Sequence, residues 1–174
     1  MPIVEPDVSL QGRHTLDQAV AINIKVLSTL FKALIDHGVH LPGCTLKSNI
    51  VNCGKDCSLS YSVKQIASAN KFVLQQTLPV SIKSANYLSG GQTLKQAAAR
   101  LAALNEINAG PWNLSFSWSA AIQLPLLELC KGHGCLQLDA MKSLYTEELE
   151  MASLAASGKW HPDLQPSDGD HTSA

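Results

Sequence analysis

The feature that most constrains this chain is the alternation of short apolar runs with longer segments of helical period. Strands are expected at residues 2–4, 40–47, 84–88 and 112–117. Helices are expected at residues 16–37, 61–76, 93–105, 120–130 and 138–157, where apolar side chains recur every three or four positions. Four strand–helix repeats with short connections predict an α/β fold whose parallel sheet is built of right-handed βαβ units.

The chain is long enough to bury one core, and we expect residues 1–158 to form a single domain. Residues 159–174 are polar and contain prolines, and the sequence predicts a disordered tail there.

Charge and hydropathy exclude several classes of partner. The formal net charge is −1, which gives no basic field for nucleic acid or an anionic membrane. No apolar run approaches the roughly 20 residues that span a bilayer, and the first ten residues lack the pattern of a signal peptide. We therefore expect a cytoplasmic protein with neither nucleic acid nor membrane as a partner.

The chain has five cysteines, an odd number that suits a reducing compartment. Cys53 and Cys57 are four residues apart, and Cys130, His133 and Cys135 form a second cluster. A structural zinc site needs about four ligands in well-spaced pairs, and neither cluster has that spacing. We expect no metal site and interpret the cysteines as reduced thiols.

Several polar residues follow the predicted strands, where enzymes with parallel sheets collect their chemistry. Lys47 ends one strand, and a lysine with a lowered pKa can form a Schiff base with a ketone. Glu5 could act as general acid and base at that imine, and Asp7 could orient it. The alternative is a solvated lysine at the rim with an ordinary pair of carboxylates, which the residues by themselves favour.

Ser89, Gly90 and Gly91 stand between a predicted strand and a predicted helix. Such a turn suits phosphate, because glycines let backbone N–H groups approach an anion and the helix N-terminus adds a favourable dipole. The same residues could equally form a tight turn with Ser89 near the helix N-cap.

Four motifs occur together in a family order: PIVEPD, LPGCTLKSNIVNCG, YLSGGQT and PWNLSFSW. In this order and approximate spacing the chain resembles the C-terminal half of a class I fructose-bisphosphate aldolase. The resemblance continues to SLAASGKW and covers nearly the whole chain.

This resemblance implies the C-terminal half of a (β/α)8 TIM barrel, about four βα units with extra terminal helices. It implies cleavage of fructose 1,6-bisphosphate, a phosphorylated sugar, through a lysine Schiff base without metal or other cofactor. Lys47 matches the Schiff-base lysine and Glu5 the proton-shuttling glutamate, while Asp7 stands where the family has a second glutamate. The turn from Ser89 through Gly90 to Gly91 matches the loop that binds one substrate phosphate.

The chain also departs from the family pattern. Ser48 replaces a proline after the lysine, and Ala120 stands where the family has a phosphate-binding arginine. Asn86 places an amide in a strand expected to be buried, and Pro125 falls inside a predicted helix. Half a barrel is also expected to expose two sheet edges and an apolar sheet face.

These departures leave alternative hypotheses to the enzyme. The chain could be catalytically inactive and bind other aldolase subunits, as a homo-oligomer or in co-assembly with full-length aldolase, or it could have no independent function. Met1 directly before PIVEP suggests a truncated gene model or a degenerate copy.

Overall fold

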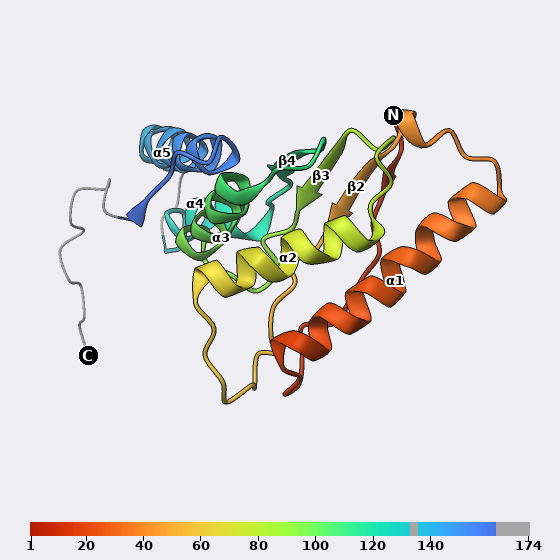
Figure 1. The fold of residues 1–174 in the computed structure, drawn as a ribbon. Coiled ribbons are helices and arrows are strands. Elements are labelled where there is room, and N and C mark those ends of the chain that lie inside the picture. The colour runs from red at the N-terminus through yellow and green to blue at the C-terminus, as the bar shows by residue number, and fades with distance from the viewer. Residues whose placement is uncertain (133–135, 163–174) are drawn as a thin grey trace.

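The computed structural model describes residues 1–132 and 136–162 and alternates strands with helices as the sequence predicts (Figure 1). The elements in chain order are β1 (Ile3–Val4), α1 (Leu16–Asp36), β2 (Thr45–Ser48), α2 (Val63–Thr77), β3 (Ser84–Tyr87), α3 (Leu94–Ile107), β4 (Asn113–Phe116), α4 (Ala120–Glu128) and α5 (Leu138–Ala156). A 3-10 turn at Leu41–Gly43 occupies the first half of the strand expected at 40–47. Pro42 lies in that turn and has no N–H for a ladder, so β2 begins only at Thr45.

The strands form one parallel sheet in the order β1-β2-β3-β4. Each strand is followed by a helix, and the helices α1, α2 and α3 cover one face of the sheet (Figure 1). Four consecutive parallel βα units are half of a (β/α)8 barrel, as expected. All carboxyl ends of the strands therefore lie at the same edge.

Three capping boxes fix where the helices begin beyond that edge. Each has a threonine or serine at the N-cap and a glutamine three residues later, and each pair exchanges hydrogen bonds between side chain and backbone. The pairs are Thr15 with Gln18, Ser62 with Gln65, and Thr93 with Gln96. The loops that carry the candidate site residues thus run into helices with fixed starting points.

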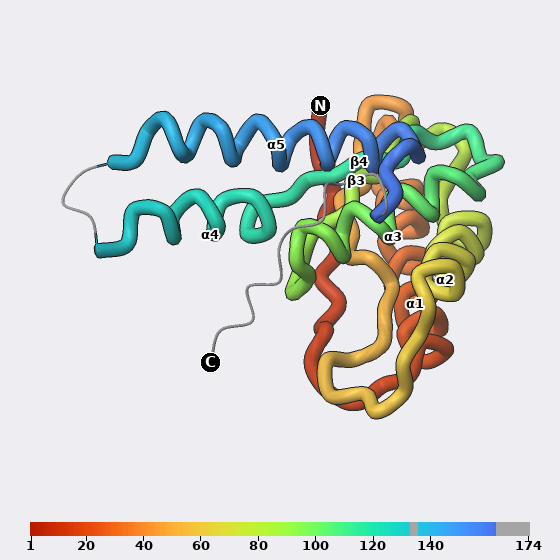
Figure 2. The backbone as a smooth tube through the Cα atoms, turned by 90° about the vertical axis from the view of Figure 1, so that its left-hand side faces the viewer, coloured from red at the N-terminus to blue at the C-terminus, as the bar shows by residue number. Residues whose placement is uncertain are grey.

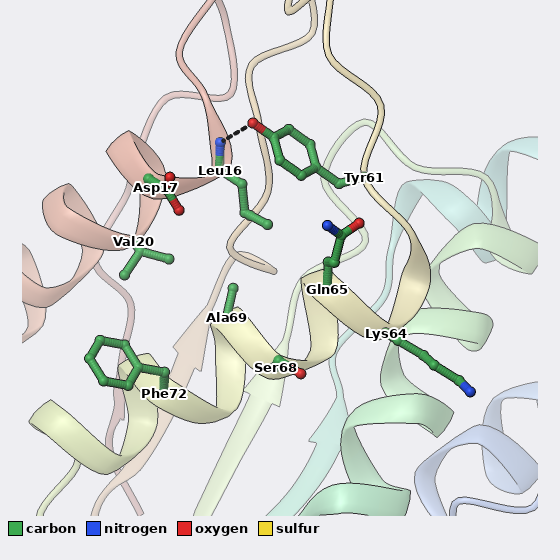
Figure 3. A pocket seen from close by; sticks show the side chains of 9 residues that line it. All are labelled: Leu16, Asp17, Val20, Tyr61, Lys64, Gln65, Ser68, Ala69 and Phe72. Atoms are coloured by element: carbon green, nitrogen blue, oxygen red, sulfur yellow. Dashed lines mark hydrogen bonds between the residues drawn. The ribbon is translucent and has the colours of Figure 1, made fainter.

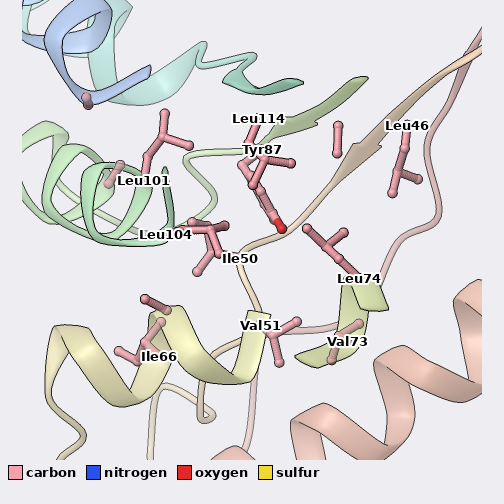
Figure 4. Packing of buried hydrophobic residues seen from close by; sticks show 14 of the residues in the cluster. Leu46, Ile50, Val51, Ile66, Val73, Leu74, Tyr87, Leu101, Leu104 and Leu114 are labelled. Atoms are coloured by element: carbon pink, nitrogen blue, oxygen red, sulfur yellow. The ribbon is translucent and has the colours of Figure 1, made fainter. Parts of the chain in front are cut away.

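The two faces of the sheet differ in chemistry. Leu46, Ala85, Tyr87 and Leu114 point toward the helices and are buried in the main core, where Ile66, Leu74, Leu101 and other side chains cover them (Figure 4). The strand register places polar side chains on the opposite face: Thr45, Lys47, Ser84, Asn86, Asn113 and Ser115. The expectation of an exposed apolar sheet face is wrong for β2, β3 and β4, because each residue that they direct to this face is polar, whereas Ile3 of β1 is apolar and exposed there.

Helices α4 and α5 lie side by side and extend away from the rest of the chain (Figure 2). Helix α4 contains Pro125, as expected, and Leu124 and Leu127 on it are more than half exposed. The end of α5 returns to the body of the protein, where Asn105 donates to the carbonyl oxygens of Ala155 and Leu114.

The described residues extend four positions past residue 158, the domain end expected from the sequence. Trp160 is buried, and with Pro162 it borders a groove that Ala99 and Arg100 of α3 also line. Of the expected tail, Trp160 is thus packed, whereas Lys159, His161 and Pro162 are exposed. Residues 163–174 lie outside the described residues, as do His133 and Cys135.

Helix α1 reaches a mean hydropathy of 1.4 over 18 residues, so its length and composition would also suit a helix that crosses a membrane. The expectation that no segment meets this criterion is wrong for α1. In this fold its buried residues recur every three or four positions and α1 packs against α2. They are Leu16, Ala19, Asn23, Leu27 and Phe31.

The side chain of Asn70 on α2 binds the segment after β2 through hydrogen bonds. Its Oδ1 accepts from the N–H of Val51 at 2.8 Å, and its Nδ2 donates to the carbonyl oxygens of Val51 at 3.0 Å and Ile66 at 2.8 Å. Asn23 is a second buried helical asparagine, but its only recorded bond within the described chain runs to Ala19 of its own helix.

We expect Asn70→Leu to lower the free energy of unfolding by about 3 kcal/mol, because the buried N–H and C=O of Val51 lose their partner. Asn23→Leu is the matched control and should change it by less than about 1 kcal/mol, since Ala19 keeps its helical bond. Urea unfolding of both variants makes the measurement. Equal losses would contradict the assigned role of Asn70.

Glu148 on α5 is 5% exposed, and its Oε2 has no hydrogen-bond partner within residues 1–132 and 136–162. Loss of water on burial, and secondarily the charge of Glu147, raises the pKa of Glu148. The folded chain therefore holds this proton more tightly than the unfolded chain, and stability falls as the pH rises past the unfolded pKa.

Glu148→Gln should accordingly raise the melting temperature, and by more at pH 7 than at pH 4. The neutral amide removes the cost of a buried unpaired carboxylate, about 1 kcal/mol or more. Glu150→Gln, on the exposed side of the same helix, is the control. A gain for Glu148→Gln that is the same at both pH values would refute the proposed cause.

Candidate functional site

The ends of β1 and β2 bring Glu5 and Lys47 together. Lys47 Nζ lies 3.0 Å from Glu5 Oε1, with 24% of the lysine side chain and 45% of the glutamate side chain exposed. The parallel register places Glu5 beside Lys47, since Ile3 pairs with Thr45 and Val4 with Leu46. Lys47 is thus mostly covered and pairs with the carboxylate of Glu5, which is itself exposed.

Asn86 is the direct neighbour of Lys47 on the other side, and Ser115 is its neighbour in turn. Asn86 is half-buried on the polar face of the sheet. From the sequence we expected only a polar amide in a buried strand at this position. Its position one residue before Tyr87, in alternation with the buried Ala85 and Tyr87, is the signal that could have placed it beside the lysine.

Asp7 is exposed and has no recorded ion pair or hydrogen bond within the described residues. The backbone after β1 carries it two residues past Glu5, into the loop that leads to α1. The structure thus brings Glu5 to Lys47 and leaves Asp7 in solvent.

Hydrogen bonds from Gln92 and Arg100 hold the turn after β3 in place. Ser89 is buried, Gly91 has φ +69°, and the Ser89 carbonyl oxygen accepts from the backbone N–H of Gln92 at 2.9 Å and from its Nε2 at 3.2 Å. Arg100 then donates to Gln92 Oε1 at 2.6 Å. Only glycine adopts this φ without strain, so the second glycine is a backbone requirement.

Arg100 is half-buried, and loss of water lowers its pKa, while the nearby Cys53 acts in the opposite direction. A guanidinium keeps its charge in proteins despite such a shift. Because its N–H groups support the side chain of Gln92, Arg100 fixes the turn from the helix side. The glutamine and arginine were missed at the sequence level.

The loop after β2 is bonded to the loop after β1. The N–H groups of Gly54, Lys55 and Asp56 donate to the carbonyl oxygens of His14 at 2.9 Å, Leu10 at 3.0 Å and Gly12 at 3.0 Å, respectively. A Cβ on Gly54 would lie 2.1 Å from the Gly12 oxygen. These backbones approach as closely as they do only because residue 54 has no side chain.

The same loop contains Cys53 and Cys57. Burial, and next the neighbouring Cys57, raises the pKa of Cys53. A raised pKa favours the protonated thiol over the thiolate at neutral pH.

At the end of β4, the rings of Phe116 and Trp118 lie 4.9 Å apart, and helix α4 begins at Ala120. Both aromatic rings border a groove of about 410 Å³ against α4 and α5. The side chain at the position of the family's arginine is a methyl group, so this strand end provides no charge for a phosphate.

A separate groove of about 650 Å³ lies between the first turns of α1 and α2 (Figure 3). Tyr61 borders it and accepts a hydrogen bond from the N–H of Leu16 at 3.3 Å. Lys47, Glu5 and the turn at 89–91 do not line it, so the groove is distinct from the strand-end site.

Comparisons with known proteins agree with this geometry. A family model described as glycolytic, fructose-bisphosphate aldolase class-I, matches residues 1–173. Fructose-bisphosphate aldolase of Dictyostelium discoideum is 38% identical over 160 residues, covering 92% of this chain and 44% of that protein. The protein of the same name from Echinococcus multilocularis is 38% identical over 173 residues, covering 97% of this chain and 47% of that protein.

A solved structure of fructose-bisphosphate aldolase from Plasmodium falciparum, in complex with TRAP and a small-molecule inhibitor, matches with a TM-score of 0.88. It is 32% identical, and the match covers 92% of this chain and 46% of that one. The chain thus spans about half the length of the curated relatives it matches.

We expect Gly54→Ala to destabilise the protein by about 2 kcal/mol or more, because neither backbone at this contact can move away cheaply. Gly43→Ala is the control: its Cβ would meet only the ring of the exposed His40, at 3.1 Å. Thermal unfolding of the two variants compares them. A Gly54 variant as stable as the Gly43 variant would show that the contact between the two loops is loose.

Proposed function

The chain belongs to the class I fructose-bisphosphate aldolase family, and on that premise we propose that it carries the Schiff-base part of an aldolase site. The substrate would be fructose 1,6-bisphosphate, and the products dihydroxyacetone phosphate and glyceraldehyde 3-phosphate. The observation that carries the proposal is the 3.0 Å contact of Lys47 Nζ with Glu5 Oε1 at adjacent strand ends.

In the proposed reaction, neutral Lys47 Nζ attacks the ketone carbon of the substrate and forms a C–N bond. Glu5, having taken one proton from the Lys47 ammonium, returns it to the carbonyl oxygen, and a second proton from the nitrogen lets that oxygen leave as water when the iminium forms. Cleavage of the C3–C4 bond sends its electron pair into the iminium and gives an enamine, as ionised Glu5 takes the C4 hydroxyl proton and the aldehyde departs. Protonation of the enamine and hydrolysis then release the triose phosphate and restore the amine.

Asp7 has the role of a second carboxylate in this proposal. It is exposed two residues beyond Glu5, where it can turn toward a substrate that covers the strand ends. Asn86, beside Lys47 in the sheet, offers an amide to a substrate hydroxyl.

Ser89, Gly90 and Gly91 would bind the phosphate nearest the ketone. Three features support this: the turn follows the strand next to Lys47, its glycines leave backbone N–H groups approachable, and α3 begins three residues later. The anchoring of the turn through Gln92 and Arg100 holds those groups in place before the phosphate arrives.

A second candidate function is association with other aldolase subunits, as a homo-oligomer or with a full-length enzyme. Its support is the surface: β1 and β4 are edge strands, and Leu124, Leu127 and Tyr145 are exposed on α4 and α5.

A cytoplasmic location accompanies both functions, because Cys44, Cys53, Cys57 and Cys130 are free thiols suited to a reducing compartment.

Borohydride trapping with dihydroxyacetone phosphate, followed by peptide mass spectrometry, tests the enzyme proposal. We expect a phosphotriose adduct on Lys47, its loss in Lys47→Arg, and labelling slowed by about 100-fold in Glu5→Gln. Intact aldolase labelled in parallel is the positive control. Absence of an adduct on Lys47, or labelling that persists on other lysines in Lys47→Arg, would overturn the proposal.

A further inference from the structure

Lys55 lies over the turn at residues 89–91. The place that a Cβ would take on Gly91 is 2.8 Å from Lys55 Cε and 3.2 Å from Lys55 Nζ. From this contact we infer that Lys55 is the cation that binds the substrate phosphate at Ser89, Gly90 and Gly91. The inference rests on the proposed function and adds to it a residue that the family resemblance does not assign.

The backbone holds Lys55 in this position. Its N–H donates to the Leu10 carbonyl oxygen at 3.0 Å, and the N–H groups of Gly54 and Asp56 make the flanking bonds to the loop after β1. Leu10 also borders the turn, since a Cβ on Gly90 would lie 3.3 Å from its Cδ1. Three loops, from three successive strands, thus meet where Lys55 crosses the turn.

Two missing side chains make the approach possible. The missing side chain of Gly54 lets the loop before Lys55 come against Gly12, and Gly91 leaves room for the end of the lysine side chain. A larger residue at position 91 would occupy the space in which the ammonium lies. The lysine and the glycine therefore form one arrangement, with the end of the lysine side chain against Gly91.

The charge of Lys55 is available for an anion. The structure records no ion pair between Lys55 and a carboxylate of residues 1–132 or 136–162. Arg100, another cation near the turn, donates to Gln92. Ala120, where the resemblance expects an arginine, has no charge to offer. Lys55 is thus placed to supply the positive charge that Ala120 cannot give to the phosphate.

The inference predicts a selective effect on phosphate. An ammonium is a compact point charge that attracts phosphate oxygens without fixed geometry, so arginine should substitute for it in part. A charge-assisted contact of this kind changes affinity by about tenfold. A ketone without phosphate gains nothing from Lys55 and should be unaffected by its loss.

Titration with inorganic phosphate, followed through the backbone N–H resonances of Gly90 and Gly91, measures the contact directly. We expect Lys55→Ala to weaken binding by about tenfold, and Lys55→Arg to restore most of it. Lys25→Ala, an exposed lysine on α1, is the matched control and should bind as the unmodified chain does. Equal affinities of Lys55→Ala and Lys25→Ala, or no shift of either glycine in the unmodified chain, would overturn the inference.

Borohydride labelling of Lys47 separates this inference from the proposed function. Lys55→Ala should need about tenfold more dihydroxyacetone phosphate for half-maximal labelling, but the same concentration of dihydroxyacetone. Phosphate binding that depends on Lys55 without any labelling of Lys47 would support Lys55 and refute the enzyme proposal. Labelling that needs the same dihydroxyacetone phosphate concentration in both chains would refute Lys55 alone.

Discussion

Parallel pairing of four short strands is the constraint on which the other features of this protein depend. The strands contain only two to four residues each, so their side chains cannot define an active site along their length. Parallel order instead places all four carboxyl ends at one edge, and the three capped helices fix how each loop leaves it. Lys47, Glu5 and the turn at 89–91 are neighbours because the strands that precede them are neighbours.

The same pairing separates apolar from polar chemistry. Side chains alternate across each strand, so Leu46 and Ser48 face the helices while Thr45 and Lys47 face the other way. The core on the helix side is continuous, and Asn70 extends it to the segment after β2 by binding both backbone groups of Val51. The polar face of the sheet can therefore hold a lysine and an asparagine with little loss of folding stability, because burial of the opposite face against the helices stabilises the sheet.

Contacts between loops place residues of the site that the sheet itself does not position. The loop after β2 is held by three backbone hydrogen bonds to the loop after β1, and this contact needs a glycine at position 54. Its consequence is that Lys55 reaches a turn belonging to a third strand. In the proposed site, the cation for phosphate comes from this loop instead of the end of β4, where Ala120 begins a helix.

The sequence by itself determined the order and type of the elements, because its apolar periodicity and its Thr/Ser-x-x-Gln helix starts are local signals. It also identified Lys47, Glu5 and the turn at 89–91 as residues at strand ends. Only the tertiary structure decided which of them meet: Glu5 pairs with Lys47, whereas Asp7 does not. The burial of Trp160 and the position of Lys55 over Gly91 likewise depend on contacts between distant segments. No local pattern encodes these, since each is fixed by residues more than 30 positions apart in the chain or by the pairing of separate strands.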